Sequence, residues 1–270
     1  MTVRHPTLVF SLLAFGYAFL YTPIFSLIVY SFNESRLVTV WAGFSTKWYV
    51  SLLHNEQLLG AAWISLRIAL MNATLAVVLG TLAGTALVRF GRFRGRSALA
   101  LMIGAPLVMP DVILGLASLL LFVAMEQLIG WPAGRGMTTI TIAHVTFSMA
   151  YVAVIVQSRL VRLDPSLEEA AMDLGARPWK VFFVITLPLI APALAAGWLL
   201  AFTLSLDDLV IASFTSGPGA STLPMVVYSS VRLGVSPEIN ALATLLVSLV
   251  TIGIVIAGWS MQRQARQARA

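Results

Sequence analysis

The stretch 168-EEAAMDLGARPWKVFFVITLP-188 combines charge, one glycine and two prolines between apolar runs of membrane length. Just before it, Asp164 and Pro165 offer a helix N-cap and a first-turn proline. Ser166 and Glu169 have the spacing of a capping box, in which each side chain bonds the other residue's backbone amide. A helix is therefore expected to start at this point.

The second half of the same stretch predicts how that helix ends. Gly175 is suited to closing it in a left-handed conformation. Arg177 and Pro178 then favour the start of a second helix. Leu187-Pro188 predicts a further boundary, because the residue before a proline disfavours helical backbone. The stretch thus predicts a short helix, a tight glycine turn and a second helix.

The composition is that of a membrane protein. Of the 270 residues, 59% are hydrophobic and only 10% are charged, with a mean hydropathy of +0.91. Soluble domains usually carry about 25% charged residues. The absence of cysteine excludes disulfides, thiolate metal sites and cysteine nucleophiles.

Six apolar stretches are long enough to cross a bilayer, which needs about 20 residues of helix. The first is too long for a signal-peptide core and no small-residue cleavage site follows it, so it is interpreted as a retained span. Together they predict an all-α membrane protein with a single transmembrane domain, residues 1–270. The predicted spans are about 8–31, 62–88, 98–123, 138–158, 189–210 and 240–260.

Most Lys and Arg residues fall on one side of this topology, which the positive-inside rule places in the cytoplasm. An even number of spans puts both termini on that side, together with the loop 159–188. The net charge of +6 is thus explained by topology and does not imply a nucleic-acid partner. The residues on the predicted cytoplasmic side are Arg4, Arg89, Arg92, Arg94, Arg96, Arg159, Arg162, Arg177, Lys180, Arg263, Arg266 and Arg269. Those on the other side are Arg36, Lys47, Arg135 and Arg232.

A family resemblance rests on three parts of the charged stretch. Glu169-Ala170-Ala171, then Gly175, then Ile185-x-Leu187-Pro188 resembles the EAA loop of permease subunits of binding-protein-dependent ABC importers. The resemblance implies the six-helix fold of a type I ABC importer permease in a bacterial inner membrane. It also implies that the loop 159–188 is a cytoplasmic coupling helix that docks on an ATPase subunit. The alternative is an ordinary amphipathic helix between two spans.

The resemblance implies further partners and carries over onto the matching residues. The expected partners are a sister permease subunit, two ATPase subunits, a periplasmic substrate-binding protein and the lipid bilayer. Glu169 is expected to cap the helix or contact the ATPase, and Gly175 to permit the turn. The residues expected to couple the permease to the ATPase are Glu168, Glu169, Ala170, Ala171, Gly175, Leu187 and Pro188.

This chain lacks the sequence features of an ATPase or another enzyme. A P-loop ends in Lys followed by Ser or Thr, whereas Lys47 precedes a tryptophan and Lys180 precedes a valine. ATP and magnesium are therefore expected on a partner ATPase, with no cofactor and no metal site in this chain. No convergent catalytic cluster is visible, so the chain is interpreted as a transporter subunit.

Carboxylates near membrane depth are the candidate pathway residues. A charged side chain at the bilayer centre is costly, so it normally faces a cavity or a partner. Asp111 follows Pro110 within the third predicted span, and Asp207 and Asp208 lie near the outer end of the fifth. These acids could line a pathway for a small cationic substrate. The alternatives are an N-cap after a helix break for Asp111 and a solvated span end for the pair.

Two tyrosines and one histidine within the predicted spans are further candidates for the pathway or for contacts between helices. Tyr17 and Tyr21 are one helical turn apart and could attract an alkyl-ammonium group, although packing against a neighbouring helix is an equal alternative. His144 lies among small polar residues of the fourth predicted span, which favours a hydrogen bond between helices over a role in the pathway.

The candidate substrate is an amine. Only Arg67 approaches the membrane interior, which disfavours an anionic substrate. The segments MPDVILG at Met109–Gly115 and LSLDDLVIASF at Leu204–Phe214 resemble polyamine permeases, most of all the second permease of a putrescine importer. Importers of spermidine, iron, thiamine or another solute remain alternatives, and so does a subunit of a secondary transporter.

Overall fold

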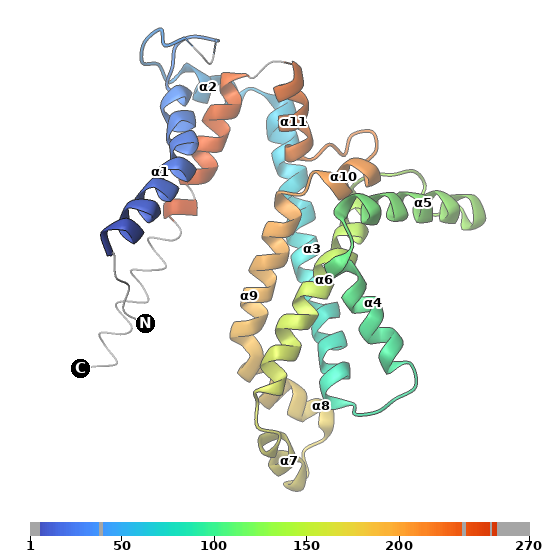
Figure 1. The fold of residues 1–270 in the computed structure, drawn as a ribbon. Coiled ribbons are helices and arrows are strands. Elements are labelled where there is room, and N and C mark those ends of the chain that lie inside the picture. Colours follow the sequence, from blue (N-terminus) through green and yellow to red (C-terminus); the bar gives the residue numbers. More distant parts are fainter. Residues whose placement is uncertain (1–5, 38–39, 234–235, 249, 253–270) are drawn as a thin grey trace. The chain divides into compact units, whose positions relative to one another are not determined.

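The structure is a computed structural model that describes residues 6–37, 40–233, 236–248 and 250–252. This part of the chain is mainly helical, with loops between the helices and no named strand (Figure 1). The helices are α1 (Pro6–Ser31), α2 (Lys47–Leu53), α3 (Glu56–Arg89), α4 (Arg96–Val108), α5 (Asp111–Ile129), α6 (Met137–Val161), α7 (Ser166–Asp173), α8 (Pro178–Val181), the π-helical turn η1 (Phe182–Thr186), α9 (Leu187–Leu206), α10 (Val210–Thr215) and α11 (Leu223–Leu233).

The chain forms two compact units, residues 1–59 with 227–270 and residues 60–226. The single transmembrane domain stays a prediction. In the first unit, the Ser31 hydroxyl at the end of α1 lies 2.7 Å from the Tyr49 hydroxyl in α2. Asn55 donates to Glu238 at 2.6 Å, and Ser51 also donates to that carboxylate. Glu238 thus ties the two sequence segments of this unit together.

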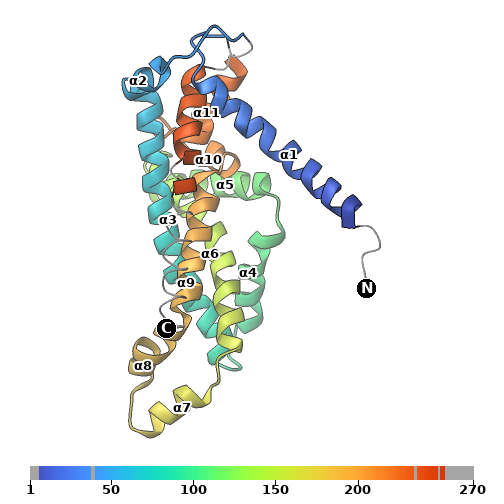
Figure 2. The ribbon, with the colours of Figure 1, turned by 90° about the vertical axis from the view of Figure 1, so that its left-hand side faces the viewer.

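The core of the second unit lies among α3, α6 and α9, which run side by side in both views (Figures 1 and 2). Asn72 of α3 is fully buried there and donates to Ser148 of α6 at 3.1 Å and to the carbonyl of Ala201 in α9 at 2.7 Å. One side chain therefore joins three spans by polar contacts that lipid cannot replace. The buried apolar residues of this core are Ala73, Ala76, Val152, Val156, Leu160, Ile190 and Ala201.

Small residues allow the backbones of α3 and α6 to come close together. A Cβ placed on Gly80 would lie 2.8 Å from the Val152 Cβ and 2.9 Å from the Met149 carbonyl oxygen. At Gly84 the nearest atom would be the Ala153 carbonyl oxygen at 3.0 Å. Membrane helices associate through such close packing because the bilayer supplies little hydrophobic drive between spans.

The third predicted span, 98–123, contains the helix break that the sequence predicts at Pro110. It divides into α4 and α5 at Met109, whose backbone is extended at φ −82° and ψ 137°. Pro110 causes this break, because it lacks an N–H and keeps the preceding residue out of the helical region. After the break, α5 runs across α6 and α9 instead of along them (Figures 1 and 2).

The remaining spans agree with the structure except at two ends. The predicted spans 8–31, 62–88 and 138–158 each lie within one helix, α1, α3 and α6 respectively. The fifth, 189–210, ends too late, because α9 stops at Leu206. The last, 240–260, overlaps an apolar helix over Pro237–Ile252, and its residues 249 and 253–260 lie outside the described residues. Among the described helices, five are long and apolar enough to cross a membrane.

Candidate functional site

Helix α7 starts where the sequence predicts, with Asp164 as its capping side chain but without the expected capping box. Pro165 already has helical backbone at φ −60° and ψ −24°, so Ser166 is the first residue of the helix and not its cap. The Ser166 amide donates to the Asp164 carboxylate at 3.0 Å, which lowers the pKa of that carboxyl. The expected capping box of Ser166 and Glu169 is therefore wrong, because the N-cap has no side-chain hydrogen bond and Asp164 satisfies the amide instead.

Gly175 ends α7 as predicted, in a left-handed conformation with φ +85°. The Ala176 amide donates to the Ala171 carbonyl at 3.0 Å, and the Gly175 amide donates to the Met172 carbonyl at 2.8 Å. This pair of bonds is a Schellman motif, which satisfies carbonyls left free at a helix end. The turn leads directly into α8, which starts at Pro178 after the extended Arg177.

The boundary expected at Leu187-Pro188 is wrong. The chain stays helical from Pro178 to Leu206 and passes through the π-helical turn η1. The Leu187 amide donates to the Phe182 carbonyl, five residues back. Pro188 offers no N–H, and its ring would crowd the carbonyl four residues earlier in a regular α-helix. The wider π turn accommodates both effects, so the proline distorts the helix without ending it.

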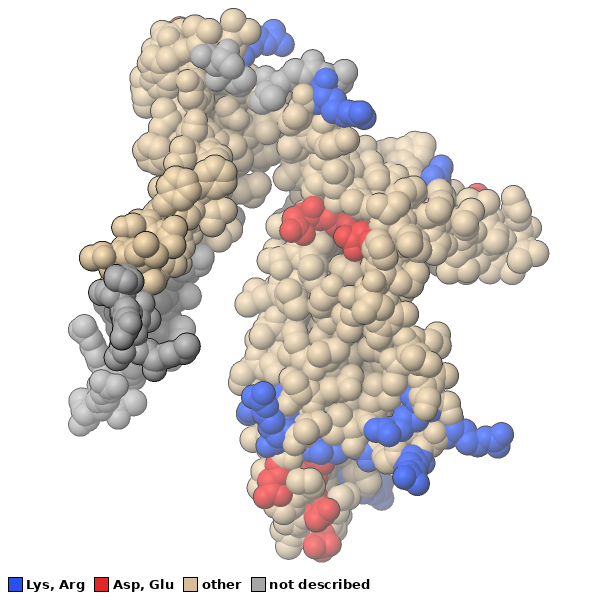
Figure 3. Space-filling view, viewed as in Figure 1, with Lys and Arg blue, Asp and Glu red and all other residues tan. Residues whose placement is uncertain are grey.

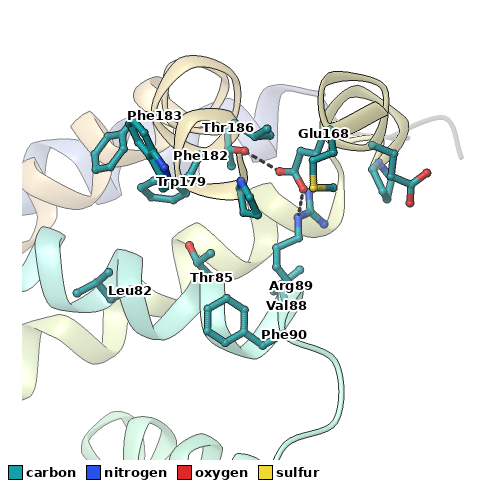
Figure 4. Close-up of a pocket in the computed structure, with 15 residues that line it drawn as sticks. Leu82, Thr85, Val88, Arg89, Phe90, Glu168, Trp179, Phe182, Phe183 and Thr186 are labelled. Carbon is teal, nitrogen blue, oxygen red and sulfur yellow. Dashed lines mark hydrogen bonds and ion pairs between the residues drawn. The ribbon is translucent and has the colours of Figure 1, made fainter. Parts of the chain in front are cut away.

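Glu168 connects α7 to two other elements (Figure 4). Its Oε2 forms an ion pair with Arg89 Nε, the last residue of α3, at 2.9 Å. Its Oε1 accepts a hydrogen bond at 2.7 Å from the hydroxyl of Thr186, the last residue of η1. The Glu168 and Arg89 side chains are 17% and 19% exposed, and Thr186 is buried. The contact is thus partly shielded from water.

A cavity of about 780 Å³ lies beside this contact, between the end of α3 and the α7–α8–η1 segment (Figure 4). Its walls are mainly apolar and aromatic. Figure 3 shows Lys and Arg side chains gathered at this end of the unit. The lining residues are Leu82, Thr85, Val88, Arg89, Phe90, Pro165, Glu168, Glu169, Met172, Pro178, Trp179, Val181, Phe182, Phe183 and Thr186.

Four of the other candidate coupling residues are more accessible than Glu168. Glu169, Ala170 and Gly175 are exposed, as is Pro188. Ala171 and Leu187 are half-buried, and Leu187 packs against the core of α3, α6 and α9. One face of α7 therefore remains open to a partner, and α7 has no buried residue at all.

The second candidate site is the junction between α9 and α10, which is built around Asp208. The amides of Ile211 and Ala212 donate to the Asp208 carboxylate at 3.3 and 2.7 Å, so this side chain caps α10. His144 of α6 reaches the same carboxylate through Nε2 at 3.1 Å, and its Nδ1 lies 2.7 Å from the hydroxyl of Ser205. His144 thus makes the expected contact between helices.

The other predicted pathway residues occupy different surroundings. Asp207 is exposed at the end of α9, and Asp111 is exposed at the first position of α5. Figure 3 shows acidic side chains over the end of α9 and the start of α5, on one face of this unit. Tyr17 and Tyr21 stack on each other on α1, with ring centroids 6.2 Å apart, and both are exposed. They belong to the other compact unit.

Replacing His144 should destabilise the junction. His144→Leu is expected to lower the free energy of unfolding by about 1–3 kcal/mol, because Asp208 and Ser205 lose a partner in a site where water cannot replace it. Thermal unfolding of the purified protein in detergent measures the change. Ser158→Ala is the control, since that α6 hydroxyl is exposed and bonds only within its own helix turn. A His144→Leu protein as stable as the wild type would contradict the structural role of this network.

Comparison with known proteins identifies the family. The family model for the "binding-protein-dependent transport system inner membrane component" matches residues 76–270. The chain belongs to this family. The permease is 63% identical over 265 residues to the putrescine transport system permease protein PotI of Escherichia coli K12, covering 98% of this chain and 94% of that protein. It is 44% identical over 239 residues to the spermidine/putrescine permease protein PotC of the same strain, covering 88% of each.

A solved structure supports the fold of this permease. A bacterial ABC transporter involved in the import of the acidic polysaccharide alginate matches with a TM-score of 0.71 at 18% identity, over 94% of both chains. The permease is therefore a multi-pass inner membrane subunit of an ABC importer and not an enzyme. Relatives of this kind work with a sister permease, an ATPase and a substrate-binding protein. A secondary transporter is thereby set aside.

The sequence does not indicate two residues that contact Glu168 in this permease. Arg89 was counted only as a cytoplasmic charge, and Thr186 falls on the variable position of the Ile185-x-Leu187-Pro188 pattern. No local signal links either residue to Glu168. The threonine hydroxyl two residues before Pro188 was the available signal, because a hydroxyl buried in a span needs a hydrogen-bond acceptor nearby.

Proposed function

We propose that this permease carries a polyamine, with putrescine as the first candidate, across the inner membrane in an ATP-driven importer. The observation that carries the proposal is the 63% identity to a putrescine permease over nearly the whole chain. The exposed carboxylates of Asp111 and Asp207 support it, because a polyamine presents ammonium groups separated by apolar carbon chains. Asp208 adds a third carboxylate at the α9–α10 junction. Its oxygens already accept hydrogen bonds from the amides of Ile211 and Ala212.

The proposal includes the orientation of the permease in the membrane. Both termini and the loop 159–188 would face the cytoplasm, where a partner ATPase binds ATP and magnesium. The basic residues gathered around α7 and α8 support this orientation through the positive-inside rule (Figure 3). The opposite face would receive the substrate from a periplasmic binding protein. A heterodimer with a sister permease and two ATPase subunits completes the proposed assembly.

In this assembly the α7 segment transmits movement of the ATPases to the spans. Closure of the ATPases around ATP would displace α7, and the continuous helix from Pro178 to Leu206 would carry that displacement to the junction at Asp207 and Asp208. This helix is 29 residues long, or about 44 Å at 1.5 Å per residue. It is therefore long enough to connect the two candidate sites across the bilayer.

Uptake of labelled putrescine tests the proposal directly. Cells without this permease and without other polyamine importers should take up little putrescine, and restoring the gene should restore uptake. Competition with unlabelled spermidine then separates the two polyamines. Unchanged putrescine uptake on deletion and restoration would reject the polyamine proposal and would direct the search to another solute.

Asp111 offers a specific prediction about the pathway. Asp111→Asn is expected to reduce polyamine uptake about tenfold, the size of effect expected when a charge-assisted hydrogen bond of about 1.5 kcal/mol is lost. The substitution keeps the size of the side chain, so the amount of assembled complex should not change. Glu126→Gln is the matched control, because Glu126 is an exposed acid at the other end of α5. Wild-type uptake by Asp111→Asn would assign Asp111 to capping of the helix break.

A further inference from the structure

Helix α7 has no buried apolar side chain that would anchor it in the core of the spans. It is eight residues long, and none of them is buried. Helices this short are marginal in isolation. An element of this kind can receive a force from a partner, but it passes the force on only through specific contacts with its neighbours.

Glu168 supplies those contacts. Among the residues that the structure describes, it is the side chain of α7 with polar bonds to other helices, and both of its oxygens are used. Oε2 pairs with Arg89 at the end of α3, and Oε1 accepts from Thr186 at the start of the helix that becomes α9. One oxygen in an ion pair and the other in a hydrogen bond place the carboxylate between the two elements (Figure 4).

We infer that Arg89, Glu168 and Thr186 form a clasp that makes α7 move together with α3 and α9 during transport. The inference rests on the proposed docking of α7 on an ATPase. Glu168 is then a positioning residue that faces inward, whereas the exposed Glu169 on the same helix remains available to the ATPase. Glu168 would thus hold α7 to its neighbouring helices, while Glu169 would contact the ATPase.

The chemistry of the clasp favours stiffness. Hydrogen bonds and ion pairs with a charged partner are shorter and stronger than neutral ones. The partial burial of Glu168 and Arg89 reduces screening by water and salt relative to an exposed pair. Thr186 is held by the π turn, so its hydroxyl cannot follow Glu168 unless the start of α9 moves as well. A displacement of α7 would therefore move the end of α3 and the helix that continues into α9.

Charge reversal in the complete transporter tests the clasp. The permease is reconstituted in liposomes with its sister permease, ATPase and binding protein, and putrescine uptake per ATP hydrolysed is measured. Arg89→Glu and Glu168→Arg are each expected to lower this ratio about tenfold, within the range of coupling found for residues in one ion-pair network. The double variant Arg89→Glu/Glu168→Arg restores the attraction and should recover most of the ratio.

Matched variants separate coupling from assembly. Arg92→Glu reverses an exposed charge on the loop that follows α3 and should leave the ratio unchanged. Thr186→Val removes one hydroxyl at nearly constant shape and should lower the ratio by a smaller factor than the charge reversals, so it serves if a reversal fails to assemble. Co-purification of the ATPase reports assembly for each variant.

Two results would overturn the clasp. One is a wild-type ratio in the assembled single variants, including Thr186→Val. The other is a double variant that assembles but stays as impaired as the single ones. Failure of the proposed function would look different, because the wild-type complex itself would then take up no putrescine or would bind no ATPase.

Discussion

Gly175→Glu is expected to leave the permease in the membrane and to reduce uptake at least about tenfold. Gly175 adopts φ +85°, a backbone conformation that costs other L-residues about 1–2 kcal/mol, and this cost shifts the α7–α8 turn away from its docking shape. The new carboxylate would also project from an exposed turn that faces the proposed ATPase. Uptake, the amount of permease in the membrane and ATPase co-purification are the three measurements.

Two milder substitutions at the same position separate backbone strain from the added side chain. Gly175→Asn should retain most uptake, because asparagine visits the left-handed region more readily than other residues. Uptake by Gly175→Ala should lie between that of Gly175→Asn and that of Gly175→Glu. A Cβ at this position meets no atom within 4 Å, so none of the three should unfold the protein. Normal coupled transport by Gly175→Glu would count strongly against docking at this turn.

Gly80→Val is expected to destabilise the packing of α3 against α6 strongly. The first added carbon would already lie 2.8 Å from Val152 and 2.9 Å from a backbone oxygen of α6, distances at which something must shift. Overpacking of this kind costs about 1–3 kcal/mol, and a branched side chain places the cost at the upper end. The three-helix core of α3, α6 and α9 would have to separate. Thermal unfolding in detergent and the yield of folded protein measure the effect.

Gly104→Ala is the control for this prediction. Gly104 lies inside α4, and a Cβ there meets nothing within 4 Å. Alanine in a helix interior is favoured over glycine by about 0.5–1 kcal/mol, so this variant should be as stable as the wild type or more so. If Gly80→Val unfolds at the wild-type temperature, the close contact between α3 and α6 does not hold in the membrane.

Particular elements show how much of the fold was predictable. The spans within α1, α3 and α6 followed from apolar length, and the start of α7 and the Gly175 turn followed from local backbone preferences. Pro110 and Pro188 carry the same local signal, a proline after an apolar residue, yet Pro110 ends a helix and Pro188 does not. The difference lies in the π turn before Pro188, which depends on how the surrounding helix is held.

The candidate sites were predictable in part for the same reason. Glu168, Gly175 and Asp208 were identified from the sequence, but the roles of Glu168 and Asp208 depend on Arg89, Thr186 and His144, which lie far away in the chain. A pattern that spans a few residues cannot indicate which distant side chain will meet it. The EAA resemblance located the proposed coupling segment and gave no information about what holds that segment to the spans.

The sequence by itself determined that this protein is helical, crosses the membrane and carries a short helix and a glycine turn between two spans. In lipid every backbone N–H and C=O must be satisfied within its own helix, so apolar length alone predicts the element. Only the tertiary structure decided that the helix continues through Pro188, how Asn72 joins three spans, and which partners share Glu168. These features depend on distances between atoms of separate helices, and those distances exist only once the helices have packed.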